Sequence, residues 1–194
     1  MPRRDDLNTI LVLGSGPIKI GQAAEFDFSG SQAVRALRED GYEVILVNSN
    51  PATIQNDPEM ADRVYIEPLL PDTVRKILEI EKPDALLAGM GGQTALNIAS
   101  ELAHDGTLEK LGVELIGSDL DAIDKAEDRE LFNQVCESID LPISKAIACN
   151  SMDEVIKAAE ELGSWPILIR PAFTLGGLGG GTAFDMGQLV EIAT

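Results

Sequence analysis

Cations and aromatic side chains are scarce in this sequence, and their scarcity excludes an extended nucleic-acid surface. The 194 residues include 15 Lys and Arg against 33 Asp and Glu, which gives a formal net charge of −18 at pH 7. So acidic a chain does not suit a phosphate backbone over a wide area. One Trp, two Tyr and five Phe are too few for a platform that stacks bases. A local anion site stays open, because backbone amides bind anions without charged side chains.

Cysteine, histidine and long apolar runs are also scarce, which removes most metal and nucleophile chemistry. Cys136 and Cys149 fit neither a disulfide framework nor a metal-binding spacing, and we expect both to be small buried side chains in a reducing compartment. The one histidine, His104, ends a predicted helix, where the helix dipole favours it, so we expect a structural role. The N-terminal apolar run at 10–13 is too short for a signal peptide or a membrane span. We therefore expect a cytoplasmic protein.

Apolar runs alternate with helical patterns over the first two thirds of the chain. The predicted strands, rich in aliphatic residues, cover 9–14, 43–48, 64–68, 85–89 and 113–117. The helical patterns run from about 29 to 39, from 71 onward, and from about 94 to 102. Strands that alternate with helices indicate a doubly wound parallel sheet. The fold class is therefore α/β, with a Rossmann-like domain over 1–127.

The pattern of residues 128–194 predicts a second domain, in which strands and helices do not alternate as they do in the first. Its predicted elements are a helix over about 128–139, a strand over 144–149, a helix over about 152–162, a strand over 166–171 and a final helix from about 186. Ser151 and Glu154 form a capping-box pattern before the second helix, and Asp185 is the expected cap of the last one. Because the pattern supplies only the first strands of a second sheet, we expect this domain to be a truncated lobe.

The first glycine loop follows the first predicted strand and contains Gly14, Gly16 and Gly21. Its third glycine lies two positions too late for a dinucleotide fingerprint. Asn48 stands where an acidic residue would hold a ribose hydroxyl. These two differences argue against an NAD-binding oxidoreductase. The simpler interpretation is a tight turn whose small residues let strand and helix pack closely.

Three loops are expected to converge on the carboxyl edge of the predicted parallel sheet. They are the loops at 14–22, 48–53 and 89–94. Ligands of open α/β sheets bind outside this edge. The residues alone leave two interpretations open: a polar cavity, or a surface that docks against another domain.

The strongest local signal is a glycine-rich loop with five glycines among residues 176–181. Ordering so many glycines costs conformational entropy, which indicates that the loop needs them for a reason. One interpretation is a flap whose backbone amides approach phosphates closely. No Gly-Lys-Ser/Thr follows, so the loop is not a Walker A motif. A plain hairpin tip is the alternative.

Two arginines are candidates for anion binding. Arg170 interrupts an apolar strand, and a guanidinium buried there would need a phosphate or a core carboxylate as partner. Arg129 lies among charged neighbours and, taken alone, fits a solvated helix face.

Five stretches make the whole chain recognisable. They are GSGPIKIGQAAEFDFSG at 14–30, NSNPATIQNDPEMADRVYIEP at 48–68, MGGQTALN at 90–97, DAIDKAEDR at 121–129 and IRPAFTLGGLGGGTAF at 169–184. With them the chain resembles the large subunit of carbamoyl-phosphate synthetases, at the start of the N-terminal synthetase half. NSNPATI and MGGQTALN favour this family over biotin carboxylases, which share the layout.

The resemblance implies a pre-ATP-grasp domain over 1–127 and the first lobe of an ATP-grasp domain over 128–194. In this family, that half is an ATP-dependent ligase of arginine and pyrimidine synthesis. It phosphorylates bicarbonate to carboxyphosphate, which reacts with ammonia. The implied partners are ATP, bicarbonate, the rest of the large chain and a glutamine amidotransferase small subunit that supplies the ammonia, with no nucleic acid and no membrane.

Carried over residue by residue, the resemblance assigns Arg129 and Arg170 to nucleotide contacts and Gly176 and Gly177 to a flap over the phosphates. It assigns no catalytic residue and no metal ligand in this chain, because the ligands of Mg²⁺ or Mn²⁺ belong to the missing lobe. We therefore expect the chain alone to be inactive. A non-catalytic scaffold and, less well supported, an NAD-binding oxidoreductase are the alternative functions.

Overall fold

The computed structural model describes residues 3–17, 25–171 and 179–194. The contacts divide the chain into two compact units, Met1–Glu127 and Asp128–Thr194. None of the helices in the described residues is long and apolar enough to cross a membrane.

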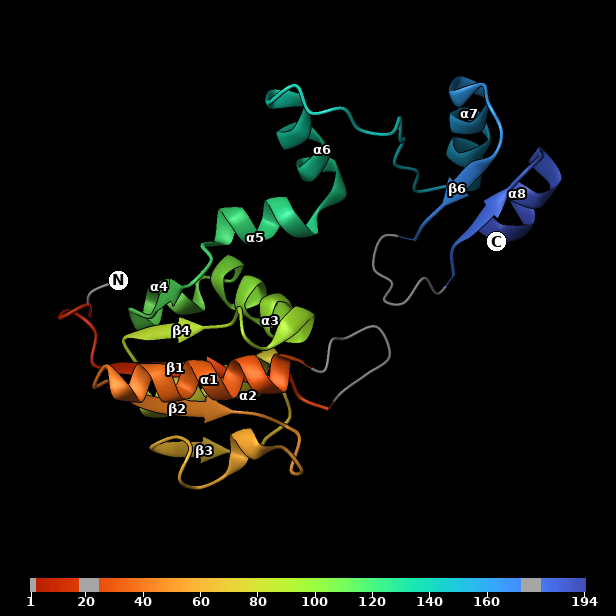
Figure 1. The fold of residues 1–194 in the computed structure, drawn as a ribbon. Helices are drawn as coiled ribbons and strands as arrows, with labels where there is room; N and C mark the ends of the chain where they lie inside the picture. Colours follow the sequence, from red (N-terminus) through yellow and green to blue (C-terminus); the bar gives the residue numbers. More distant parts are fainter. Residues whose placement is uncertain (1–2, 18–24, 172–178) are drawn as a thin grey trace. The chain divides into compact units, whose positions relative to one another are not determined.

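The first unit is a parallel sheet with helices on both faces, as predicted (Figure 1). Its strands are β1 (Thr9–Leu13), β2 (Glu43–Val47), β3 (Arg63–Tyr65), β4 (Ala85–Leu87) and β5 (Glu114–Ile116). Its helices are α1 (Glu25–Glu39), α2 (Pro71–Glu81), α3 (Gly92–His104), α4 (Thr107–Leu111) and α5 (Leu120–Glu127), with a short 3-10 turn at Ile54–Asn56. The strand order is β3-β2-β1-β4-β5, and each neighbouring pair is parallel.

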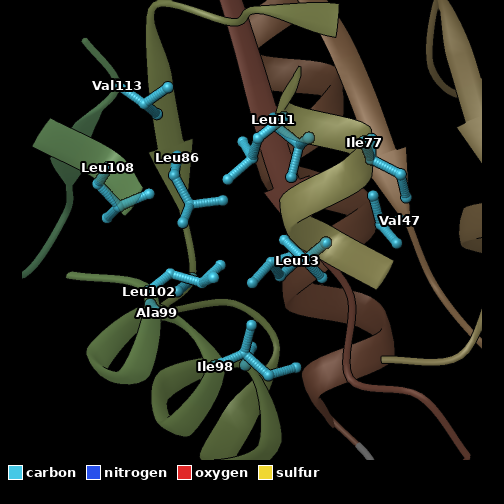
Figure 2. Close-up of a cluster of buried hydrophobic side chains, with 14 of the residues drawn as sticks. Leu11, Leu13, Val47, Ile77, Leu86, Ile98, Ala99, Leu102, Leu108 and Val113 are labelled. Carbon is cyan, nitrogen blue, oxygen red and sulfur yellow. The ribbon is translucent and has the colours of Figure 1, made fainter. Parts of the chain in front are cut away.

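Alternate residues of the strands supply two hydrophobic layers, because successive side chains of a strand point to opposite faces. Leu11, Leu13 and Leu86 pack against α2, α3 and α4 on one face (Figure 2). Ile10 and Val12 pack on the other face with Val34 of α1. A strand buried on both faces must be apolar throughout, which explains the unbroken apolar runs in the sequence.

The second unit contains one antiparallel hairpin and three helices in its described residues. They are α6 (Arg129–Ser138), α7 (Met152–Leu162), β6 (Ile167–Ile169), β7 (Gly181–Ala183) and α8 (Met186–Ala193). The strands pair as Ile167↔Ala183 and Ile169↔Gly181. Ala183 and Leu189 are the buried centre of a small cluster with α7 and α8.

The predicted helix caps form, with one change. The Ser151 hydroxyl accepts from the Glu154 amide at 3.3 Å, and the Asp185 carboxylate accepts from the Gln188 amide at 2.9 Å. The Glu154 carboxylate accepts from the amide of Asn150 at 2.6 Å and not from that of Ser151, so the box closes one residue earlier than the standard motif.

Two predictions for this unit are wrong. Residues 144–149 form no strand, because no described strand pairs with them and most are exposed to solvent. Cys136 is buried as expected, but Cys149 is partly exposed on that unpaired segment. Partial burial of the Cys149 thiol raises its pKa, and the negative charge of the nearby Glu154 carboxylate raises the pKa further.

We predict that Leu86→Ala lowers the free energy of unfolding of the first unit by about 2–5 kcal/mol, since Leu86 is fully buried and its truncation leaves a cavity. Ile80→Ala is the matched control: Ile80 is 70% exposed on α2, and we expect a change within about 0.5 kcal/mol. Urea denaturation followed by circular dichroism measures both. Equal effects of the two substitutions would contradict this core.

Candidate functional site

Two places in the fold gather the residues that the sequence singled out, and the first is the carboxyl edge of the parallel sheet. The strand order reverses between β1 and β4, the position where open α/β sheets bind ligands. The loops after β1 and β2 pack tightly beside it: a Cβ on Gly14 would lie 2.5 Å from Asn48 Nδ2. The loop after β4 also approaches β1, since a Cβ on Gly91 would lie 2.6 Å from the Leu13 carbonyl oxygen.

A buried amide pair holds this edge together. Asn48 and Gln55 are both fully buried, and Asn48 Nδ2 donates to Gln55 Oε1 at 3.1 Å. Gln55 Nε2 donates to the carbonyls of Phe26 and Asp27, at 3.2 and 3.0 Å, in the first turn of α1. The side-chain oxygen Oδ1 of Asn48 accepts from the backbone amide of Asn50 at 3.0 Å. These amides therefore organise the unit itself, which matches the tight-turn interpretation of the first glycine loop and weakens the NAD alternative.

His104 has the structural position expected for it. It is the last residue of α3, and its Nε2 lies 3.1 Å from Asp124 Oδ2 of α5. The described residues contain no group of three or more His, Cys, Asp or Glu side chains that could hold a metal ion.

We predict that Gly91→Ala destabilises the first unit by about 1–3 kcal/mol, because the new methyl would overlap backbone oxygens that cannot move aside. Gly89→Ala, two residues away, is the control, since a Cβ there meets no atom within 4 Å. Thermal unfolding of the two variants separates them. If Gly89→Ala cost as much as Gly91→Ala, the close packing at this edge would be refuted.

The second place is the loop end of the β6–β7 hairpin, where Arg170 directly follows β6. The expectation of a buried guanidinium is wrong, because Arg170 is exposed. Ile167 and Ile169 turn toward the small core of this unit, while the alternate residue Leu168 is 65% exposed. Arg170 continues the exposed side of the strand, since residues two apart share a face.

Arg129 reaches the same end of the hairpin from the start of α6. Its Nη1 donates to the Pro171 carbonyl oxygen at 2.9 Å, so its guanidinium lies beside the residue that follows Arg170. Asp128 caps α6 by accepting from the amides of Glu130 and Leu131, which fixes where the helix begins. In the part of the chain that the structure describes, neither Arg129 nor Arg170 forms an ion pair. The two predicted site residues, 41 positions apart in sequence, are thus linked through Pro171, and neither has an ion-pair partner among the described residues.

The glycine-rich loop connects β6 and β7, and its predicted site residues Gly176 and Gly177 lie outside the described residues. The glycines that follow have a packing role that the sequence did not reveal. A Cβ on Gly180 would lie 2.8 Å from the Ile169 carbonyl oxygen, and one on Gly181 would lie 3.2 Å from Ile192. Gly179 has a φ of +72°, which an L side chain rarely adopts. Part of the glycine run is therefore needed for the hairpin itself.

Comparison with known proteins identifies the family. Residues 6–125 match the carbamoyl phosphate synthase preATP-grasp domain, and residues 128–194 match the carbamoyl-phosphate synthase L chain, ATP binding domain. The chain belongs to the carbamoyl-phosphate synthase large-chain family. The resemblance read from the five sequence stretches is confirmed.

Relatives match along the whole chain. It is 60% identical to the carbamoyl phosphate synthase large chain of Archaeoglobus fulgidus over 193 residues, which cover 100% of this chain and 18% of that protein. The large chain of Synechocystis sp. is 58% identical over 192 residues, with 99% and 18% covered. The large chain, N-terminal section, of Aquifex aeolicus is 56% identical over 191 residues, with 98% and 34% covered. The chain thus spans about a fifth of the large chains from Archaeoglobus and Synechocystis.

Solved structures share the fold at low sequence identity. The biotin carboxylase domain of Hydrogenobacter thermophilus 2-oxoglutarate carboxylase, solved with MgADP and bicarbonate, aligns with a TM-score of 0.72 at 17% identity and covers 97% of this chain and 40% of that one. D-alanine–D-alanine ligase from Bacillus anthracis aligns with a TM-score of 0.54 at 16% identity, over 95% and 52%. The predicted fold class, a Rossmann-like sheet followed by an ATP-grasp lobe, is confirmed.

Proposed function

We propose that this carbamoyl-phosphate synthase chain belongs to the synthetase half that uses ATP to phosphorylate bicarbonate to carboxyphosphate. The observation that carries the proposal is the 56% identity to a relative named as the N-terminal section of the large chain, over 98% of this chain. The match to a biotin carboxylase domain solved with MgADP and bicarbonate supports the same class of substrates.

Arg129 and Arg170 are the residues that we propose to contact the nucleotide. Both are exposed, and Arg129 contacts the residue next to Arg170 at the root of the glycine-rich loop. Guanidinium groups without a carboxylate partner suit phosphate oxygens, which accept two parallel hydrogen bonds from one arginine. Gly176 and Gly177, in the loop that follows Arg170 in sequence, would bring backbone amides close to the same phosphates.

Phosphoryl transfer needs positioning and charge neutralisation more than it needs a protein nucleophile. Arg129 and Arg170 would hold the phosphate chain and offset its negative charge. We propose that Mg²⁺ or Mn²⁺ serves the reaction through ligands outside this chain, in the remainder of the large chain. The proposed partners are that remainder and a glutamine amidotransferase small subunit, which supplies ammonia for carbamoyl phosphate in arginine and pyrimidine synthesis.

The test is a chimeric synthetase in which this chain replaces the matching segment of the Archaeoglobus fulgidus large chain. We predict that Arg170→Ala lowers kcat/KM for bicarbonate-dependent ATP hydrolysis by about 10²–10³-fold, since it removes one of the two charges that we propose to offset the phosphates. Arg170→Lys should retain part of the activity. Arg35→Ala is the control: this arginine is exposed in the first unit, and its loss should leave the rate unchanged. An Arg170→Ala chimera as active as its parent would overturn the assignment.

The isolated chain should not catalyse the reaction. We predict no bicarbonate-dependent release of phosphate from ATP and weak or undetectable binding of Mg-ATP, because these residues supply only part of the contacts that the phosphates need. Phosphate release and calorimetric titration measure the two quantities, with the chimera as positive control. Hydrolysis by the chain alone at a rate near that of the chimera would contradict this prediction.

A further inference from the structure

Strand β3 forms one edge of the parallel sheet and carries exposed apolar surface. The sheet order places β3 at the end, with β2 as its only neighbour in the described sheet. Ile66, directly after the strand, is 53% exposed, and Val64 is only partly buried. An edge strand presents unpaired backbone groups and is a ready template for another strand.

The backbone groups of this edge point outward at Val64 and Ile66. The Tyr65 carbonyl accepts from the Asn48 amide at 3.0 Å, so the backbone of Tyr65 faces β2. Because these groups alternate along a strand, the N–H and C=O of Val64 and Ile66 face away from the sheet. In the described sheet, no strand lies on that side of β3. The edge therefore offers two donors and two acceptors at the spacing of an antiparallel ladder.

The sequence of this edge is complementary to itself. If two copies pair antiparallel about Tyr65, Val64 of one copy lies opposite Ile66 of the other, and Arg63 lies opposite Glu67. Apolar and opposite-charge cross-strand pairs both stabilise a sheet. Arg63 bonds Glu43 through Nη2 at 2.6 Å and Glu81 through Nε at 3.0 Å, which leaves its Nη1 without a partner among the described residues.

A groove beside the strand can receive the partner's side chains. It has a volume of about 340 Å³ and is lined by Asn56, Pro58, Ala61, Asp62, Val64 and Ile66. Among the described residues, Asn56 Oδ1 is the buried side-chain oxygen or nitrogen atom that has no hydrogen-bond partner. The groove lies on the face of β3 that carries Val64 and Ile66, so in the antiparallel pair the partner's Ile66 would lie over it.

We propose that β3 is a docking edge for a second copy of this chain, through an antiparallel β3–β3 pair centred on Tyr65 that joins two five-stranded sheets. The proposal rests on the edge, the groove and their self-complementarity, and it is independent of the proposed enzymatic function.

Sedimentation velocity over 5–200 µM (about a 40-fold range) tests the pair with two matched lysine variants. We expect the wild-type chain to shift from monomer toward dimer as concentration rises. Ile66→Lys should raise the dissociation constant at least tenfold, because it places a charge against the partner's Val64. Ile80→Lys, which changes an even more exposed isoleucine on α2, should dimerise like the wild type. Circular dichroism checks that both variants fold.

Hydrogen exchange of the wild-type chain gives a second readout that needs no variant. The amides of Val64 and Ile66 should exchange more slowly at 200 µM than at 5 µM, whereas that of Leu115, on the opposite edge strand β5, should not depend on concentration. A wild-type chain that stays monomeric over the whole range would overturn the proposal. So would a dimer that Ile66→Lys leaves intact, since another surface would then hold it.

Discussion

Strand β1 is enclosed on every side, and the first unit is arranged around that enclosure. Leu11, Val12 and Leu13 are fully buried between β2 and β4 and between helices on both faces. Where such a strand ends, the chain must pack tightly. Its buried backbone N–H and C=O groups leave the sheet there and need other hydrogen-bond partners. At the carboxyl edge the Gly14 N–H donates to the Val47 carbonyl oxygen at 2.8 Å, and the Asn48 side chain packs so close that Gly14 has no room for a side chain.

The polar side chains of the two units have different roles. At the edge of the large sheet, where related architectures bind ligands, the Asn48 and Gln55 amides are used to hold loops and α1 together. In the second unit, the hairpin has only two strands in its described residues, and its outer face is not covered by them. Arg129 and Arg170 are exposed, and neither has an ion-pair partner among the described residues, so both guanidinium groups are accessible to an anionic ligand.

The strands of the first unit were predictable, because burial on both faces demands apolar runs that any sequence reader can locate. α4 and α5 were not predicted, since five- and eight-residue helices leave too short a periodic pattern. The strand predicted at 144–149 failed for the opposite reason: its apolar pattern exists, but strands form only with a partner, and pairing is not written in a single segment.

The sequence by itself determined the family, the order of the elements and the residue types available for binding phosphate, because long motifs and hydrophobic periods are local properties. Only the tertiary structure decided that Arg129 lies beside Pro171. It also decided that Arg170 is exposed and that the amides of Asn48 and Gln55 bind each other. These outcomes depend on which distant segments of the chain come into contact. Packing sets the burial and pairing of such segments, whereas the spacing of residues along the chain does not.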